Sequence, residues 1–170
     1  MNKEIPPEEL NELKTPTVEY TVVSRAGWGA QESKSSLKPL KHPIKNILMA
    51  FNTNVEDCTT KDECKERMRQ LQQMHLDKGL PDMHYNFTVG GDGNIYEGRG
   101  WNYQPEPFKE NSQFDETSIC VGVLGDSNDP DPENPFPPLI HALYLANYGV
   151  EQKFMEDPYE FAEDEQKFDS

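Results

Sequence analysis

The side chains best suited to metal binding or nucleophilic chemistry are a small set of histidines and cysteines. They are His42, His75, His84, His141, Cys58, Cys64 and Cys120. Zinc sites usually place two ligands at a short spacing, such as C-x-x-C or H-x-x-x-H. No pair in this set has either spacing. We therefore expect no bound metal ion and no cofactor.

A second chemical feature is an arginine between two glycines, in the stretch MHYNFTVGGDGNIYEGRGW at 83–101. Two apolar runs flank the turn GGDG, a pattern typical of a β-hairpin. The chain is acidic, so any acidic ligand would have to be held by a local cation. Arg99 is the candidate. The competing interpretation is an exposed hairpin arginine that pairs with a nearby carboxylate such as Glu97.

The charge balance excludes some classes of partner. The chain has 31 Asp and Glu against 16 Lys and Arg, a formal charge of −15. Nucleic-acid binding requires clustered cations, and anionic membranes attract basic rather than acidic surfaces. No run approaches the roughly 20 apolar residues of a membrane helix. We expect neither nucleic-acid binding nor membrane contact by this domain.

The elements that must position these residues are predicted from hydrophobic periodicity. Strands are expected at 18–24, 45–51, 84–89, 94–98 and 118–125. Thr60 and Glu63 form the T-x-x-E pattern of a capping box, which predicts the start of a helix that ends near Gly79. Its apolar face is expected at Cys64, Met68, Leu71 and His75. A second helix is expected to bury Leu139, Leu143, Ala146 and Val150.

The order of these elements predicts one α/β domain with a central mixed β-sheet flanked by α-helices. A chain of 170 residues is long enough for one hydrophobic core. We expect a flexible acidic leader at 1–16, the folded domain at 17–160 and an acidic tail at 161–170.

The cysteines leave two interpretations open. Cys58 and Cys64 lie on either side of the predicted helix start, where a short disulfide is feasible. From the residues alone, a bridge and a pair of free thiols are equally good interpretations. A bridge would indicate an oxidising compartment. Cys120 lies in an apolar run and is expected to be buried and unpaired.

Five segments, in this order, resemble the peptidoglycan recognition protein domain, which is related to zinc-dependent N-acetylmuramoyl-L-alanine amidases. They are VSRAGWGA, NILMAFNTNVEDCTTKDEC, MHYNFTVGGDGNIYEGRGW, SICVGVLGD and ANYGV. The resemblance runs over residues 23–159, and its hairpin segment is the most specific. It implies a muropeptide groove on one face of the domain and a disulfide between Cys58 and Cys64. It also implies an extracellular protein, either secreted or the ectodomain of a membrane protein.

Active members of that family hold zinc with two histidines and a cysteine, and the resemblance implies that this chain lacks all three. Phe51 and Asp164 fall on the histidine positions, and no cysteine follows Cys120 in the sequence. A phenylalanine ring has no lone pair for a metal. We therefore expect no amidase activity. Tyr85 matches the tyrosine beside the metal and is expected to pack as a strand residue.

The resemblance also implies a set of groove residues for muropeptide binding. They are Thr53, Gly79, Leu80, His84, Tyr85, Arg99, Trp101 and Asn102. Arg99 matches the arginine that pairs with the extra carboxylate of diaminopimelic acid. Leu80 replaces a tryptophan of the family, and a loop carrying Glu106 replaces one with a histidine. Because muropeptides are anionic, the added negative charge opposes binding.

These observations predict a non-catalytic domain in innate immune signalling. It would act as a co-receptor or a decoy, through association with another peptidoglycan recognition protein or an immune receptor. One alternative is a direct sensor of diaminopimelic-acid peptidoglycan fragments through Arg99. A second alternative is a residual amidase with an unconventional metal set.

Overall fold

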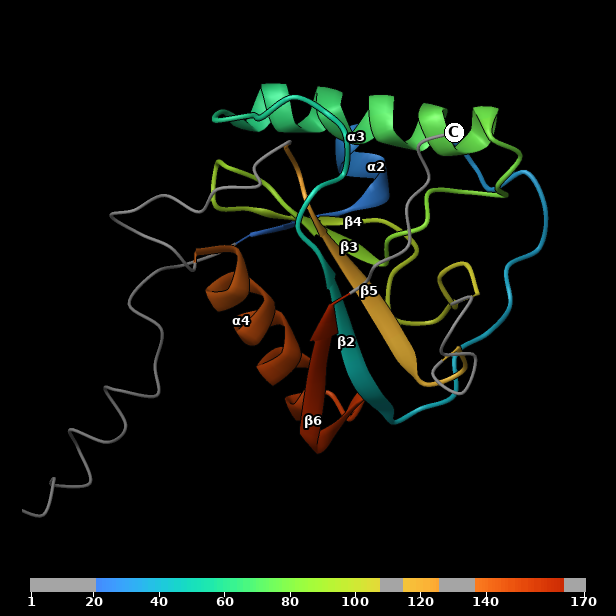
Figure 1. Cartoon of the computed structure of the whole chain (residues 1–170), viewed down its shortest axis with the longest axis vertical. Coiled ribbons are helices and arrows are strands. Elements are labelled where there is room, and N and C mark those ends of the chain that lie inside the picture. The colour runs from blue at the N-terminus through green and yellow to red at the C-terminus, as the bar shows by residue number, and fades with distance from the viewer. Residues whose placement is uncertain (1–20, 108–114, 126–136, 164–170) are drawn as a thin grey trace, which may run out of the picture.

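The domain is a six-stranded sheet with helices on both faces (Figure 1). The computed structural model describes residues 21–107, 115–125 and 137–163, so the expected leader, Asp164 and residues 165–170 lie outside it. The strand order is β1-β4-β3-β5-β2-β6. β3 and β4 are antiparallel, and all other neighbours are parallel. The predicted mixed α/β sheet is confirmed.

The centre of the sheet is made of two apolar runs that are buried on both sides. β2 (Ile44–Ala50) pairs in parallel with β5 (Ser118–Val123). Because successive strand residues point to opposite faces, each run feeds two cores. Leu48 and Cys120 join the cluster under α2 and α3, whereas Ile47 joins the cluster under α4.

Helix α3 (Lys61–Asp77) begins as the sequence predicts. The Thr60 hydroxyl accepts a hydrogen bond from the Glu63 backbone N–H, and the Glu63 carboxylate accepts one from the Thr60 N–H. Together they satisfy two amides of the first turn. The expected apolar face is confirmed, since Cys64, Met68, Leu71 and His75 are all buried. Gly79 follows the helix with a φ of 88°, a left-handed conformation that favours glycine.

The predicted hairpin is β3 (Phe87–Val89) and β4 (Ile95–Glu97). Its turn lies directly against the loop before α3, because a Cβ on Gly91 would come within 2.1 Å of the Cys58 carbonyl oxygen. Only glycine fits such an approach without displacing the backbone. The glycine-rich turn therefore fixes the hairpin to the start of α3.

Asn86, the residue before β3, ties three segments together from a fully buried position. Its Nδ2 donates to the carbonyls of Gly100 (2.9 Å) and Tyr103 (2.7 Å), and its Oδ1 accepts from the Cys120 N–H (2.9 Å). Both N–H groups of this amide and its oxygen are therefore hydrogen-bonded within the protein. The hairpin, the loop after it and β5 are joined at this point.

The structure contains the disulfide between Cys58 and Cys64, and Cys120 is buried and takes no part in a disulfide. The two cysteines are separated by six positions in the sequence, so the bridge closes a short loop. We expect the double variant Cys58→Ser/Cys64→Ser to lose about 2 kcal/mol of unfolding free energy, because the unfolded chain regains the freedom of that loop. Urea unfolding with and without dithiothreitol measures this. A wild-type midpoint that reduction leaves unchanged would contradict the expectation.

Two elements were not anticipated from the sequence. Helix α2 (Arg25–Trp28) is a single turn after the short strand β1 (Val22–Val23), in a stretch for which the sequence predicted no element. Strand β6 (Met155–Glu163) pairs with β2 across the boundary expected between residues 160 and 161. Residues 161–163 therefore belong to the sheet rather than to a tail.

Helix α4 (Pro137–Glu151) covers the second face of the sheet. It buries Ala142, Leu145 and Ala146. The expected burial of Leu143 is wrong, because that side chain is 37% exposed. One residue step turns a helix by about 100°, so Ala142 and Leu143 cannot face the same side. No helix in the described part of the chain has the length and apolar character to cross a membrane.

Candidate functional site

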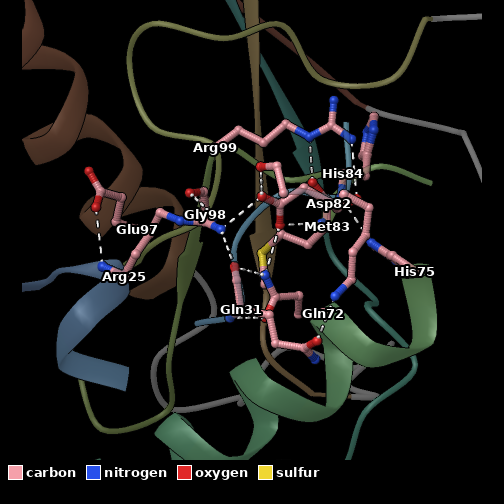
Figure 2. A network of polar contacts seen from close by, with 12 residues as sticks. Arg25, Gln31, Gln72, His75, Asp82, Met83, His84, Glu97, Gly98 and Arg99 are labelled. Atoms are coloured by element: carbon pink, nitrogen blue, oxygen red, sulfur yellow. Dashed lines mark hydrogen bonds and ion pairs between the residues drawn. The ribbon is translucent and has the colours of Figure 1, made fainter. Parts of the chain in front are cut away.

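Arg99 follows β4 and turns inward, with its side chain only 2% exposed. Its Nε donates to the Met83 carbonyl (2.6 Å) and Nη2 to the Asp82 carbonyl (3.2 Å). Nη1 donates to the Gln104 carbonyl (2.8 Å) and to Glu106 Oε2 (3.2 Å). Figure 2 shows the guanidinium at one end of a polar cluster. The expectation of an exposed hairpin arginine is therefore wrong.

Glu97, expected as a partner of Arg99, bonds to a different residue. Its carboxylate accepts from the backbone N–H of Arg25 in α2 (3.2 Å), and the Arg25 Nη1 donates to the Gly98 carbonyl (2.8 Å). The same guanidinium pairs with Asp82 at 2.8 Å. The unanticipated helix α2 thus brings the second arginine of the cluster to the hairpin (Figure 2).

Asp82 is the central carboxylate of the cluster and is fully buried. It accepts hydrogen bonds from the Ser33 hydroxyl (2.6 Å), from Gln72 Nε2 in α3 (3.0 Å) and from the Met83 N–H (2.7 Å). A buried carboxylate is tolerated when it is paired and hydrogen-bonded in this way. Sequence reasoning missed Asp82, which lies in a loop without any motif.

Two histidines continue the network toward the loop after β4. The His84 N–H donates to His75 Nδ1 (2.9 Å), and the Glu106 N–H donates to His84 Nδ1 (3.0 Å). His75 lies on the buried face of α3. This burial is the main cause that lowers the pKa of His75 to about 3, so the ring is neutral at physiological pH. His84 is fully buried and precedes β3 rather than lying in it. Its ring packs edge-on against Tyr85.

Of the two positions that match zinc ligands in the resemblance, the structure describes only Phe51, which follows β2. Phe51 is 44% exposed, and the Thr53 hydroxyl donates to the Val123 carbonyl (2.9 Å). Tyr85 is buried beside Thr53, since both side chains approach Gly122. Within the described ranges, no group of three or more His, Cys, Asp or Glu could hold a metal ion. Phe51 has no donor atom, so this end of β2 does not fit the zinc of active family members.

The remaining candidates are not all on the same side of the sheet as Arg99. Gly79 and the half-buried Leu80 follow α3, and the Leu80 N–H donates to the His75 carbonyl (3.1 Å). Trp101 stacks on Phe154 in the cluster under α4, on the other face of the sheet. Asn102 is exposed. The structure therefore groups Arg99 with His84 and the α3 end, and separates it from Trp101.

Comparison with known proteins gives a consistent set of relatives, although no family model matches the chain. Peptidoglycan recognition protein 1 of Mus musculus is 32% identical over 140 residues, covering 82% of this chain and 74% of that protein. Peptidoglycan-recognition protein 2 of Holotrichia diomphalia is 34% identical over 110 residues, or 62% of this chain. The match spans about half (54%) of the Holotrichia protein's length.

Solved structures agree with these relatives. Wild-type Drosophila PGRP-LB superposes with a TM-score of 0.76 at 27% identity, covering 87% of this chain and 84% of that one. The ectodomain complex of PGRP-LCa and PGRP-LCx, solved with tracheal cytotoxin, has a TM-score of 0.71 at 29% identity and covers 84% and 83%. Sequence and fold together assign this chain to the peptidoglycan recognition protein family.

Proposed function

We propose that the chain is a non-catalytic peptidoglycan-recognition domain of innate immune signalling. It acts as a co-receptor or decoy by associating with another peptidoglycan recognition protein or an immune receptor. The observation that carries the proposal is the inward-facing Arg99, which donates to Met83, Asp82, Gln104 and Glu106. An arginine engaged by four protein groups offers little to the carboxylate of a muropeptide.

The residues that follow β2 support the absence of catalysis in this proposal. Catalytic zinc needs three protein ligands and an open position for water. Phe51 supplies no ligand there, and the Thr53 hydroxyl is used by the Val123 carbonyl. A residual amidase would need a metal set that the described ranges do not contain.

Association with a relative is supported by a solved complex of two family members. The PGRP-LCa and PGRP-LCx ectodomains form a complex with tracheal cytotoxin. An extracellular location is part of the same proposal. It is supported by the Cys58–Cys64 disulfide and by the relative PGRP-LCa, which is a Drosophila transmembrane receptor whose ectodomain has been solved.

A second candidate function is direct sensing of diaminopimelic-acid muropeptides. It is favoured by the relative PGRP-LE, which has been solved with the monomeric diaminopimelic acid-type ligand tracheal cytotoxin. In this chain, direct sensing would require Arg99 to break its ion pair with Glu106 and to pair with a carboxylate of the ligand instead. We expect a calorimetric titration of the full chain with a monomeric diaminopimelic-acid muropeptide to be flat. A clear heat of binding would favour the sensor.

The test of the proposed function is association with a loaded relative. The full chain is mixed with a PGRP-LCx-type ectodomain that carries the muropeptide, and sedimentation velocity is recorded up to about 100 μM, where weak interfaces of this kind are populated. We expect a faster-sedimenting complex with the loaded relative. The matched control is the same relative without muropeptide. Sedimentation as two independent species at every concentration would overturn the proposal.

A further inference from the structure

The loop after β4 carries a single carboxylate between two prolines, at Pro105, Glu106 and Pro107. Each proline fixes its own φ and restricts the residue before it, so the segment 104–107 has little freedom to lose when it is ordered. Glu106 is held at both ends. Its N–H donates to His84, and its carboxylate pairs with Arg99 at 3.2 Å.

The pair is unequal in exposure. The Arg99 side chain is 2% exposed, whereas that of Glu106 is 23% exposed. The arginine is therefore buried under its own counter-ion, and the carboxylate lies on the solvent side. Other contacts of the guanidinium are to main-chain carbonyls, which are neutral.

The charges around Arg99 balance while Glu106 is present. Burial lowers the pKa of Arg99, and Glu106 and Asp82 counteract this effect, while Arg25 adds to it. In the two ion pairs of the cluster, Arg25 is matched by Asp82 and Arg99 by Glu106. Removing the Glu106 carboxylate would leave Arg99 without its ion-pair partner, next to a space of the size and shape of a carboxylate. A buried, uncompensated cation is costly, so an anion from solution is favoured there.

We propose that Glu106 is a built-in occupant of a carboxylate-binding position at Arg99, and that it determines which ligands the domain accepts. The inference rests on the proposed function, in which the intact domain does not bind muropeptide by itself. The internal carboxylate competes at very high effective concentration, because it is tethered and the prolines on either side of it restrict its backbone. A free carboxylate ligand is thereby excluded. This arrangement explains how the domain can contain Arg99 and yet not bind a muropeptide by itself.

The first experiment uses acetate as the probe. Thermal unfolding of the full chain is followed for wild type, Glu106→Ala and the control Glu116→Ala, in sodium acetate and in sodium chloride of equal ionic strength. Glu116 is a matched control because its carboxylate also pairs with a cation, Lys41, but both side chains are exposed. We expect acetate to raise the midpoint of Glu106→Ala by a few degrees over chloride, and to leave the other two proteins unchanged. Equal effects of the two salts on Glu106→Ala would overturn the inference.

The second experiment uses the monomeric diaminopimelic-acid muropeptide. We expect Glu106→Ala to bind it at least about tenfold more tightly than wild type, because one charge-assisted contact becomes available. Glu106→Gln preserves the side-chain volume and removes the charge, so it tests the idea even if the alanine variant folds poorly. Tight binding by wild type, or no gain in either variant, would overturn the inference. Failure of the wild-type chain to associate with a loaded relative would overturn the proposed function and leave the acetate result intact.

Discussion

Replacing Arg99 with alanine is expected to lower the free energy of unfolding by about 3–5 kcal/mol, the range for removing one partner of a buried ion pair. The change would leave the carbonyls of Met83, Asp82 and Gln104 without these donors. It would also remove the cation beside Glu106. Urea unfolding followed by tryptophan fluorescence measures the loss.

Arg69→Ala is the matched control for this experiment. Arg69 lies on α3, is exposed, and donates to a single carbonyl, that of Trp28 (2.9 Å). Losing one such hydrogen bond costs about 1 kcal/mol. If Arg99→Ala were no more destabilising than Arg69→Ala, the buried cluster would not contribute to stability as its geometry indicates. A large loss would also mean that Arg99→Ala cannot separate ligand binding from folding, whereas the Glu106 variants can.

We expect His75 to make the domain less stable in mild acid. The pKa of this buried histidine is lowered from 6.5 to about 3. Between these values the unfolded chain binds a proton that the folded domain does not, so stability falls as the pH decreases from 6.5 toward 3. We expect the contribution of His75 to decrease by about 1.4 kcal/mol for each pH unit within this window. Unfolding free energies between pH 7 and 4 measure the slope.

The variant His75→Asn isolates this contribution from that of the carboxylates. An asparagine oxygen can replace Nδ1 as acceptor for the His84 N–H, and the side chain does not titrate. We expect its stability to fall less steeply than that of wild type between pH 6 and 4. His42→Asn controls for the removal of an imidazole, because His42 is exposed and lies outside the cluster. Parallel pH profiles for wild type and His75→Asn would show that His75 is not the cause.

The elements that follow from sequence are those with strong local signals. The capping box at Thr60 and the buried apolar runs of β2 and β5 each carry a local sequence pattern that predicts the element. Helix α2 is a single turn, too short for periodicity to appear, although Ser24 and Gly29 cap it as expected for a helix. Strand β6 is exposed, acidic and interrupted by Pro158, and only its pairing with β2 makes it a strand.

The site was less accessible to sequence reasoning than the fold. Arg99 could be singled out as a cation between glycines in an acidic chain, and the bridge at Cys58 followed from a resemblance. Neither observation predicts that Arg99 turns inward, because most of its partners are main-chain carbonyls, which carry no sequence signature. Glu106 could be named as an added negative charge, but its pairing with Arg99 depends on a loop conformation that only the fold defines.

The internal bonding of Asn86 has a consequence for how the chain can be produced. Asn86-Phe87-Thr88 has the form of an N-glycosylation acceptor. In the folded domain, both amide hydrogens of Asn86 are donated to the carbonyls of Gly100 and Tyr103, and the side chain is fully buried. Attachment of a sugar would replace one of these hydrogens, and there is no space for the sugar around the buried side chain. A glycan at Asn86 and the native hairpin therefore exclude each other, so a sugar found there would mark molecules that were modified while unfolded and in which the native hairpin has not formed.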